Sequence, residues 1–414
     1  MEPCQNEPMI ETLRSVIRFR PLELDGTVRR LSRAANTEDL RRLAKRRLPA
    51  GVFDYIDGAA EDERTLADNT EAFARFSFVP RVLRDVSEVD TSTSLFGQPL
   101  PLPLVLSPTG FSRIADPQGE LAVARAARRA GLPYTLSTMA TRSIEEVRAV
   151  SDGDLWFQVY VWRDRELVRD MLARAAAAGY STIAITVDTA VLGRRERDVR
   201  RGFSLPPKIG LDTIIEGIRK PAWTAAFMRS EPIRFANMSG SGAEDGGNTA
   251  VNLSEYINSQ FDPSLSWADI DWFRDQWPGK VVLKGIQSVA DARIAVDHGV
   301  DAIALSNHGG RQLDGAPAPI DLVAPVADAV GGQVAILCDG GVRRGSDIVK
   351  AVALGADACM IGRAYLYALG AGGERGVDQA LRLLAEGMRR TMALSGVTSV
   401  KELDRELLTA TPLR

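Results

Sequence analysis

The 414-residue sequence contains only two histidines and three cysteines. Cys4, Cys338 and Cys359 stand at unrelated spacings, so we expect neither a disulfide framework nor a metal site built on cysteine. Few cysteines without a framework fit a reducing compartment. The sequence therefore predicts no bound metal.

Charge of one sign and long apolar runs are also scarce. The formal net charge is −3, which gives no reason to expect nucleic acid as a partner. No uncharged apolar stretch of about 18 residues occurs, and the segment from Met1 to Ile10 lacks the basic and apolar regions of a signal peptide. We therefore expect a cytoplasmic protein without a spanning helix.

Two nucleotide-binding motifs are missing as well. The sequence has no GxxxxGK followed by Ser or Thr, and no GxGxxG that opens a strand–helix–strand unit with a suitable acidic residue. A nucleoside triphosphate site and an NAD site of the Rossmann type are both disfavoured.

From Pro101 onward, short apolar segments alternate with helical patterns. Because the segments are uniformly apolar, both faces of each strand should be buried. Eight such units predict an α/β fold, a closed (β/α)8 TIM barrel, with a doubly wound open sheet as the alternative. The strands are expected at 103–106, 134–136, 155–160, 182–187, 281–284, 302–305, 334–337 and 358–361.

Other regions flank the barrel. Residues 1–36 form an N-terminal arm of unassigned role, and residues 37–405 form one functional domain with its barrel from about 101. The domain starts with a helical segment that Thr37 can cap. A long irregular excursion, from about 189 to 279, follows the fourth strand, and residues 406–414 form a C-terminal tail.

All eight predicted strands end in polar or glycine residues. In a barrel these ends meet on one face, where function sits, whereas an open sheet would place its chemistry at one switch point. The ends are Ser107–Gly110, Ser137–Met139, Gln158–Tyr160, Thr186–Asp188, Lys284–Gly285, Ser306–His308, Asp339–Gly341 and Gly362–Arg363.

One strand end carries His308 and Arg311 on glycine-rich backbone. A base beside an anion-binding group suits proton abstraction from a substrate with a carboxylate. The alternative is a polar loop that happens to contain both residues. The second histidine, His298, lies at a helix C-terminus and is expected to be structural.

Two glycine-containing turns, Asp339–Gly345 and Gly362–Arg363, follow the last two strands. Their backbone N–H groups and the following helix N-termini favour a phosphate, and Arg343 and Arg363 can add charged hydrogen bonds. Two ordinary turns are the alternative. The pair favours a phosphate-bearing ligand at this side of the barrel.

Four motifs in this order resemble the FMN-dependent L-2-hydroxy acid oxidases and dehydrogenases, a family that includes glycolate oxidase, L-lactate dehydrogenase and L-mandelate dehydrogenase. The resemblance covers about residues 37–405 and implies FMN as the cofactor. The motifs are Asp54-Tyr55 with Gly58–Asp62, Thr186–Asp188 with Gly193–Glu196, Ser306–Asp314, and Asp339–Gly345.

The resemblance also implies roles for individual residues. His308 would be the base, and Asp188 would stabilise its imidazolium. Arg195 and Arg311 would clamp the substrate carboxylate, and Lys284 would stabilise negative charge on the reduced flavin. Tyr55 and Tyr160 match substrate-binding tyrosines, Tyr160 also serving the reaction. The matched flavin-contacting positions are Pro108, Thr109, Gly110, Ser137, Gln158, Thr186, Lys284, Ser306, Asp339, Gly341, Arg343, Gly362 and Arg363.

Two positions bear on the substrate and the electron acceptor. Met139 stands where glycolate-preferring relatives carry a large aromatic residue, so L-lactate, or a larger aliphatic or aromatic acid such as mandelate, is favoured over glycolate. Gly110 stands where many oxidases carry Ala, which favours a quinone or cytochrome acceptor. The alternative is an oxidase that passes electrons to O2 and makes H2O2.

The excursion contains a segment, 214–229, in which apolar residues alternate with Arg and Lys. Membrane-associated members of the family carry their membrane contact in this region, which implies peripheral attachment to the inner face of the membrane. The pattern fits an interfacial helix only in part, because Pro221 interrupts it. A helix packed on the barrel or on a neighbouring subunit is equally supported.

The resemblance further implies a homotetramer.

Overall fold

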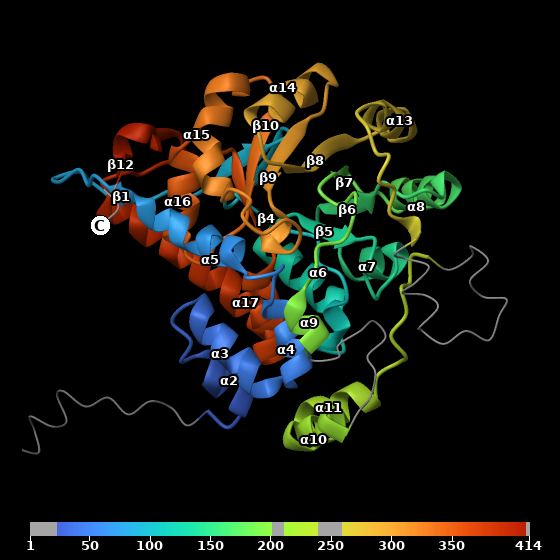
Figure 1. Cartoon of the computed structure of the whole chain (residues 1–414). Helices are drawn as coiled ribbons and strands as arrows, with labels where there is room; N and C mark the ends of the chain where they lie inside the picture. The colour runs from blue at the N-terminus through green and yellow to red at the C-terminus, as the bar shows by residue number, and fades with distance from the viewer. Residues whose placement is uncertain (1–22, 201–210, 239–258, 411–414) are drawn as a thin grey trace, which may run out of the picture.

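The computed structural model describes residues 23–200, 211–238 and 259–410, and its centre is a closed barrel of eight parallel strands (Figure 1). The strands follow one another around the ring in chain order, with β11 paired to β4. This closure excludes the doubly wound sheet and confirms the TIM barrel. The strands are β4 (Leu104–Leu106), β5 (Tyr134–Ser137), β6 (Leu155–Tyr160), β7 (Thr182–Thr186), β8 (Lys280–Ile286), β9 (Ala302–Ser306), β10 (Ala335–Asp339) and β11 (Ala358–Ile361).

Helices cover the outside of the barrel, so that both faces of each strand are buried. Every residue of β4, β5, β7, β9 and β11 is buried, which is why these segments lack the alternation of a half-exposed strand. The covering helices are α6 (Gly119–Ala130), α7 (Ile144–Val150), α8 (Arg165–Ala177), α14 (Val289–Asp297), α15 (Pro319–Val330), α16 (Gly345–Ala353) and α17 (Arg363–Leu394).

The last helix, α17, starts earlier than the sequence indicates. It begins at Arg363, immediately after β11, but its backbone is non-helical at Gly372 and Gly373. Glycine lowers helix propensity and adopts the positive φ of 62° found at Gly373. This interruption is why the sequence pattern indicates a helix only from about residue 377.

Four helices precede the barrel; α2, α3 and α4 pack beside α17, and α5 packs against the turn at residues 308–310 (Figure 1). One of them, α2, lies within the stretch expected to be an arm, residues 1–22 of which fall outside the description. The prediction that Thr37 caps the next helix was wrong: the Asn36 side chain accepts from the Asp39 N–H, and the Thr37 hydroxyl donates to the Arg343 carbonyl. The helices are α2 (Gly26–Leu31), α3 (Thr37–Arg47), α4 (Ala50–Asp57) and α5 (Arg64–Glu71).

Two small antiparallel sheets complete the fold. The hairpin of β2 (Thr93–Leu95) and β3 (Gln98–Leu100) packs Leu95 and Leu100 against the inner core of the barrel. The short strand β1 (Phe76–Phe78) pairs with β12 (Leu408–Ala410). Part of the expected C-terminal tail is therefore ordered in a sheet.

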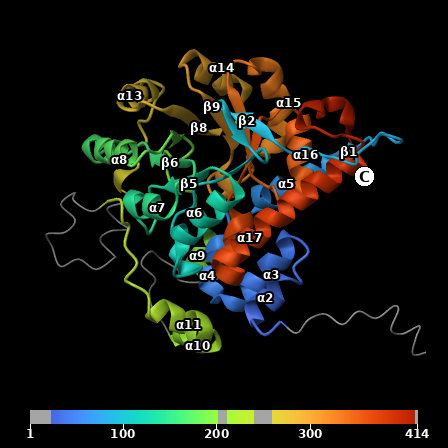
Figure 2. The same ribbon diagram turned by 180° about the vertical axis from the view of Figure 1, so that it is seen from behind.

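The excursion after β7 is helical over much of its described length, not irregular. Its helices are α9 (Glu196–Arg200), α10 (Leu211–Arg219), α11 (Pro221–Met228) and α13 (Ala268–Gln276). Pro221 occupies the first turn of α11 and separates it from α10, as the sequence predicts. In both views α10 and α11 lie at the edge of the molecule (Figures 1 and 2), and Trp223 of α11 donates to the Ile114 carbonyl at 2.8 Å. No helix in the described ranges is long and apolar enough to cross a membrane.

Candidate active site

A cavity of about 560 Å³ opens at the carboxyl ends of the barrel strands. Seventeen of the nineteen predicted site residues line it. The other two, Asp188 and Ser306, are buried directly behind lining residues, where they bond to His308 and Lys284. The lining residues are Tyr55, Pro108, Thr109, Gly110, Ser137, Gln158, Tyr160, Thr186, Arg195, Lys284, His308, Arg311, Asp339, Gly341, Arg343, Gly362 and Arg363.

His308 follows β9 and is paired with a buried carboxylate from the end of β7. Its Nδ1 lies 3.0 Å from Oδ1 of Asp188, whose side chain is only 2% exposed. The backbone of His308 is left-handed, with φ of 57°, and its N–H donates to the Ser306 hydroxyl at 3.1 Å. A non-glycine residue held in this region is a local strain, of a kind that clusters at functional sites.

Asp188 can approach this position because residue 285 is glycine. Gly285 has φ of 117°, and a Cβ there would lie 2.8 Å from the Asp188 Cβ. Oδ2 of Asp188 is buried without a hydrogen-bond partner among the described residues. The carboxylate therefore faces His308 on one side, and Lys284 is a more distant cation.

Lys284 lies near the carboxyl end of β8, and its side-chain cation is buried. Its Nζ lies 2.8 Å from Oδ2 of Asp339 and 3.1 Å from the Ser306 hydroxyl. Burial alone would lower the pKa of Lys284, but the Asp339 carboxylate outweighs it and the pKa is raised. Burial would likewise raise the pKa of Asp339, and Lys284 instead lowers it, helped by the hydroxyls of Ser107 and Ser306. Both groups therefore stay charged.

A chain of side-chain hydrogen bonds runs along the neighbouring strand ends. The Ser137 hydroxyl donates to Oε1 of Gln158 at 2.9 Å, and Nε2 of Gln158 donates to the Thr186 hydroxyl at 2.9 Å. All three residues are buried. The chain fixes the amide of Gln158, so that a planar polar ligand beside it would meet donors and acceptors in set positions.

Two arginines at the cavity face backbone carbonyls. Arg311 donates to the carbonyls of Tyr55 and Gly58, and Arg363 donates to those of Gly58, Gly309 and Ile56. In the described part of the chain neither forms an ion pair with a carboxylate. Burial and then the neighbouring Arg195 lower the pKa of Arg311 to about 10, and burial lowers that of Arg363. This excess of positive charge suits two anionic groups of bound ligands.

Both proposed carboxylate-binding arginines contact the aromatic ring of Tyr55. The guanidinium carbons of Arg195 and Arg311 are 5.8 and 5.0 Å from its centroid. Nε of Arg195 also lies 3.5 Å from Oδ2 of Asp198, which lines the cavity. Stacking on one ring orients both guanidinium groups toward the same space.

Tyr160 approaches the same space from the end of β6. Burial, and then the nearby Asp188 carboxylate, raises its pKa, so its hydroxyl remains a neutral donor at physiological pH. Its ring packs against Trp162 and Phe261 at centroid distances of 6.3 and 5.3 Å. The hydroxyl is thus carried on a ring fixed by its aromatic neighbours.

Sequence reasoning missed an aromatic wall of the cavity formed by Phe111, Phe235 and Phe261. Phe111 and Phe235 have ring centroids 5.1 Å apart. Phe235 and Phe261 come from the excursion, where no strand end or motif signals them. Asp198 was also missed, although it lies three residues beyond Arg195. His298 lies elsewhere: its Nδ1 is 2.8 Å from Asp271 and its ring stacks on Trp267, as expected for a structural histidine.

The two predicted glycine turns, Asp339–Gly345 and Gly362–Arg363, have the features of a binding site for the phosphate end of a cofactor. Gly341 has φ of 79°, and a Cβ there would lie 1.7 Å from the Asn69 carbonyl oxygen, so only glycine allows this turn. The N-terminus of α17, at Arg363, points its first N–H groups to the same side of the barrel. A Cβ built on Gly362 meets nothing closer than 3.6 Å. Cations and backbone donors at one end match the phosphate end of a flavin mononucleotide.

Fold and site together are those of a barrel enzyme whose cavity has cations and backbone donors suited to a phosphate-bearing cofactor and to an anionic substrate. The chain belongs to the FMN-dependent dehydrogenase family, whose sequence pattern matches residues 44–410. Its cofactor is accordingly FMN, and it is an oxidoreductase that acts on 2-hydroxy acids.

Individual relatives agree with this assignment. A Mycobacterium tuberculosis protein provisionally named an L-lactate dehydrogenase is 47% identical over 397 residues, which cover 96% of this chain and 94% of that protein. The L-lactate dehydrogenase of Caulobacter vibrioides is 44% identical over 375 residues, covering 90% and 97%. The crystal structure of the monotopic membrane protein (S)-mandelate dehydrogenase superposes with a TM-score of 0.88 at 40% identity, covering 92% of this chain and all of that one.

Proposed function

We propose that the protein oxidises an L-2-hydroxy acid to the 2-keto acid, with L-lactate to pyruvate as the leading reaction, and passes the electrons to a quinone or cytochrome-type carrier. The observation that carries the proposal is the His308–Asp188 pair, which faces the same cavity as Arg195 and Arg311. A base beside two carboxylate-binding cations matches the chemistry of this substrate class.

The residues divide the work as follows. Arg195 and Arg311 bind the substrate carboxylate and fix the α-carbon before His308. His308 takes a proton from the substrate, and Asp188 stabilises the resulting imidazolium. Tyr55 and Tyr160 hold the substrate through their hydroxyl groups. These steps need only the side chains that line or support the cavity.

FMN, when bound, would accept the two electrons of the oxidation together with the second hydrogen, the first leaving as the proton that His308 takes. Arg343, Arg363, Gly341 and Gly362 would hold its phosphate end. Lys284 is a cation fixed by Asp339, and it would stabilise the negative charge of the reduced ring system. The Ser137–Gln158–Thr186 hydrogen bonds would orient the polar edge of the ring.

The choice of substrate side chain rests on the apolar part of the cavity. Met139 and the Phe111–Phe235 pair line it, and a flexible Met admits a side chain larger than hydrogen. These contacts support lactate or a larger aliphatic or aromatic acid such as mandelate over glycolate.

Anaerobic bleaching of the flavin tests the proposal directly. The purified holoenzyme would be mixed with a panel of L- and D-2-hydroxy acids while the flavin absorbance is followed. We expect L-acids to bleach it and D-acids to leave it oxidised. A flavin that no 2-hydroxy acid reduces would refute the proposal.

The electron acceptor separates a dehydrogenase from the alternative, an oxidase that makes H2O2. Gly110 supports the dehydrogenase. Stopped-flow reoxidation of the reduced flavin by O2 is compared with reoxidation by a quinone analogue. We expect the quinone to be faster, and a rapid reaction with O2 would establish the oxidase.

Peripheral attachment to the inner face of the membrane through residues 214–229 is a further part of the proposal. Ile218 and Met228 are 73% and 77% exposed, and α10 and α11 lie at the edge of the molecule (Figure 2). Flotation with anionic lipid vesicles should be lost on Ile218→Gln and Met228→Gln.

A homotetramer is the expected assembly, and light scattering measures it.

A further inference from the structure

The short helix α9 follows Arg195 directly, and none of its residues is buried. Apolar packing therefore contributes little to where this segment lies. Its position over the cavity must depend on polar contacts, and these can be traced to single side chains.

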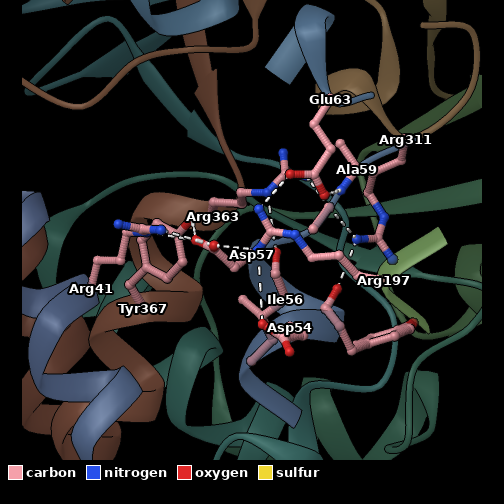
Figure 3. A network of polar contacts seen from close by, with 12 residues as sticks. Arg41, Asp54, Ile56, Asp57, Ala59, Glu63, Arg197, Arg311, Arg363 and Tyr367 are labelled. Atoms are coloured by element: carbon pink, nitrogen blue, oxygen red, sulfur yellow. Dashed lines mark hydrogen bonds and ion pairs between the residues drawn. The ribbon is translucent and has the colours of Figure 1, made fainter. Parts of the chain in front are cut away.

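Arg197, in α9, makes the most extensive of these contacts (Figure 3). Its Nη1 donates to Oδ2 of Asp57 at 2.9 Å and lies 3.8 Å from Asp54. Its Nη2 donates to Glu63. Arg197 thus joins the excursion to the helices that precede the barrel, with one guanidinium bound to two carboxylates.

Asp57 is a rigid anchor for this contact. It is 4% exposed, and it accepts from Nε and Nη2 of Arg41 at 2.6 and 2.9 Å and from the Tyr367 hydroxyl at 2.7 Å. Burial alone would raise the pKa of Asp57, but the hydrogen bonds from Arg41 and Tyr367 hold it well below its ordinary value. The carboxylate is charged and held from two other helices.

The anchor lies next to the substrate-facing residues. Asp57 is two residues beyond Tyr55, and the following carbonyl, that of Gly58, accepts from both Arg311 and Arg363. The Glu61 N–H donates to the carbonyl of Arg194 at 2.9 Å. The same turn thus holds one carboxylate-binding arginine directly and reaches the segment of the other through Arg197.

We propose that Arg197 is a positioning residue that acts through Asp57 and Glu63 to hold Arg195 over the cavity, and so sets the affinity for the substrate carboxylate. The inference rests on the proposed function, because it takes Arg195 to bind that carboxylate. It assigns Arg197 no contact with the reacting atoms, so it concerns binding and not the chemical step.

A pair of matched variants tests this assignment. Arg197→Met keeps the length of the side chain and removes its donors. Arg200→Met changes the same helix at a residue whose side chain is 70% exposed and, among the described residues, bonds only to Glu196, one turn away. FMN content and Tm of both holoenzymes are measured first, followed by anaerobic stopped-flow reduction over a range of L-lactate concentrations.

For Arg197→Met we expect the apparent dissociation constant to rise about tenfold or more, while the limiting reduction rate stays within about threefold of wild type. Arg197→Lys keeps a charge but cannot bind both carboxylates as a guanidinium does. Its apparent dissociation constant should therefore lie between those of wild type and Arg197→Met. Arg200→Met should match wild type. A dissociation constant for Arg197→Met within about twofold of wild type would overturn the proposal. So would a fall in the limiting reduction rate of this variant that is matched by a fall in its FMN content.

Binding of pyruvate to the oxidised holoenzyme gives a second readout, because a carboxylate ligand near the flavin perturbs its visible spectrum. Arg197→Met should weaken pyruvate binding about tenfold, and Arg200→Met should not. This titration needs no turnover. If wild type reduces no hydroxy acid, the proposed function fails while the pyruvate titration still decides whether Arg197 positions a carboxylate-binding group.

Discussion

Nδ1 of His308 lies 3.0 Å from Oδ1 of Asp188, and the second oxygen of that carboxylate has no hydrogen-bond partner among the described residues. The Asp188 charge is thus directed at one nitrogen of the ring. His308 also lines the cavity, where a substrate would lie. This arrangement underlies the proposed role of His308 as the base and yields two direct predictions.

Replacing the base should abolish reduction of the flavin. In His308→Gln, a neutral amide of similar size occupies the site but cannot accept the proton, so the rate of anaerobic bleaching by L-lactate should fall by about 10³-fold or more. FMN content should remain that of wild type, because the substitution removes none of the groups proposed to bind the phosphate. Bleaching at near the wild-type rate would contradict the assignment of the base.

Replacing the partner of the base should slow the same step less completely. Asp188→Asn preserves the shape of the side chain and removes the charge that stabilises the imidazolium, so we expect the limiting reduction rate to fall about a hundredfold. The apparent dissociation constant of the substrate should change little, because Asp188 does not line the cavity. Single-turnover stopped-flow separates the two quantities. A purely weaker binding would argue for a structural role of Asp188.

Gly285 should tolerate no side chain. In Gly285→Ala the new methyl group would lie 2.8 Å from the Asp188 Cβ, at a backbone φ of 117°, so either the carboxylate or strand β8 must shift. We expect a loss of about tenfold or more in reduction rate and a lower Tm. Gly179, which also has a positive φ (73°) and whose Cβ would meet nothing within 4 Å, is the control. Gly179→Ala should lower Tm through backbone strain alone and leave the rate unchanged.

The Lys284–Asp339 pair makes a prediction about pH. Because the folded-state pKa of Asp339 is lowered from 3.8, its contribution to wild-type stability is complete above that value and is lost only as pH falls below it. Between pH 5 and 8 this pair should therefore leave the wild-type Tm unchanged. Removing the cation should reverse the direction of the Asp339 shift, because only the effect of burial and two hydroxyl hydrogen bonds would remain.

In Lys284→Met the raised pKa of Asp339 means that the folded state binds a proton which the unfolded state releases. The Tm deficit relative to wild type should then shrink as pH is lowered from 8 to 5. Scanning calorimetry of the apoprotein across this range measures the deficit. The double variant Lys284→Met/Asp339→Asn should show no such slope. A deficit that is constant with pH would show that Asp339 stays ionised without its lysine.

The barrel could be predicted from the sequence because its information is local. Each strand, such as β6 at Leu155–Tyr160, is a short apolar run between turn residues, and the polar residues that follow it must meet at one face once the ring closes. The predicted helix boundaries were wrong where two neighbouring residues can both cap a helix, or where glycines interrupt one. Asn36 and Thr37 can both cap, and the double glycine at 372–373 interrupts α17.

The site was predictable where one motif carries the chemistry and obscure where it depends on tertiary contacts. His308, Asp188 and the two glycine turns lie at strand ends, so sequence alone selects them. Phe235 reaches the cavity only through the path of the excursion. The Arg197–Asp57 contact joins residues 140 positions apart in the chain, and no local pattern distinguishes these two charges from solvated ones.

The origin of the residues around the cavity has a consequence for how such an enzyme can change. The groups suited to the cofactor come from the barrel strands themselves, as with Lys284 and Gln158, or from the turns directly after them. Tyr55, Arg195 and Phe235 instead come from the preceding helices and the excursion. Substitutions or insertions in these outer segments can therefore alter which acid is accepted while the electron-accepting half of the enzyme stays intact. In this chain, substrate range and cofactor binding can therefore change independently of each other.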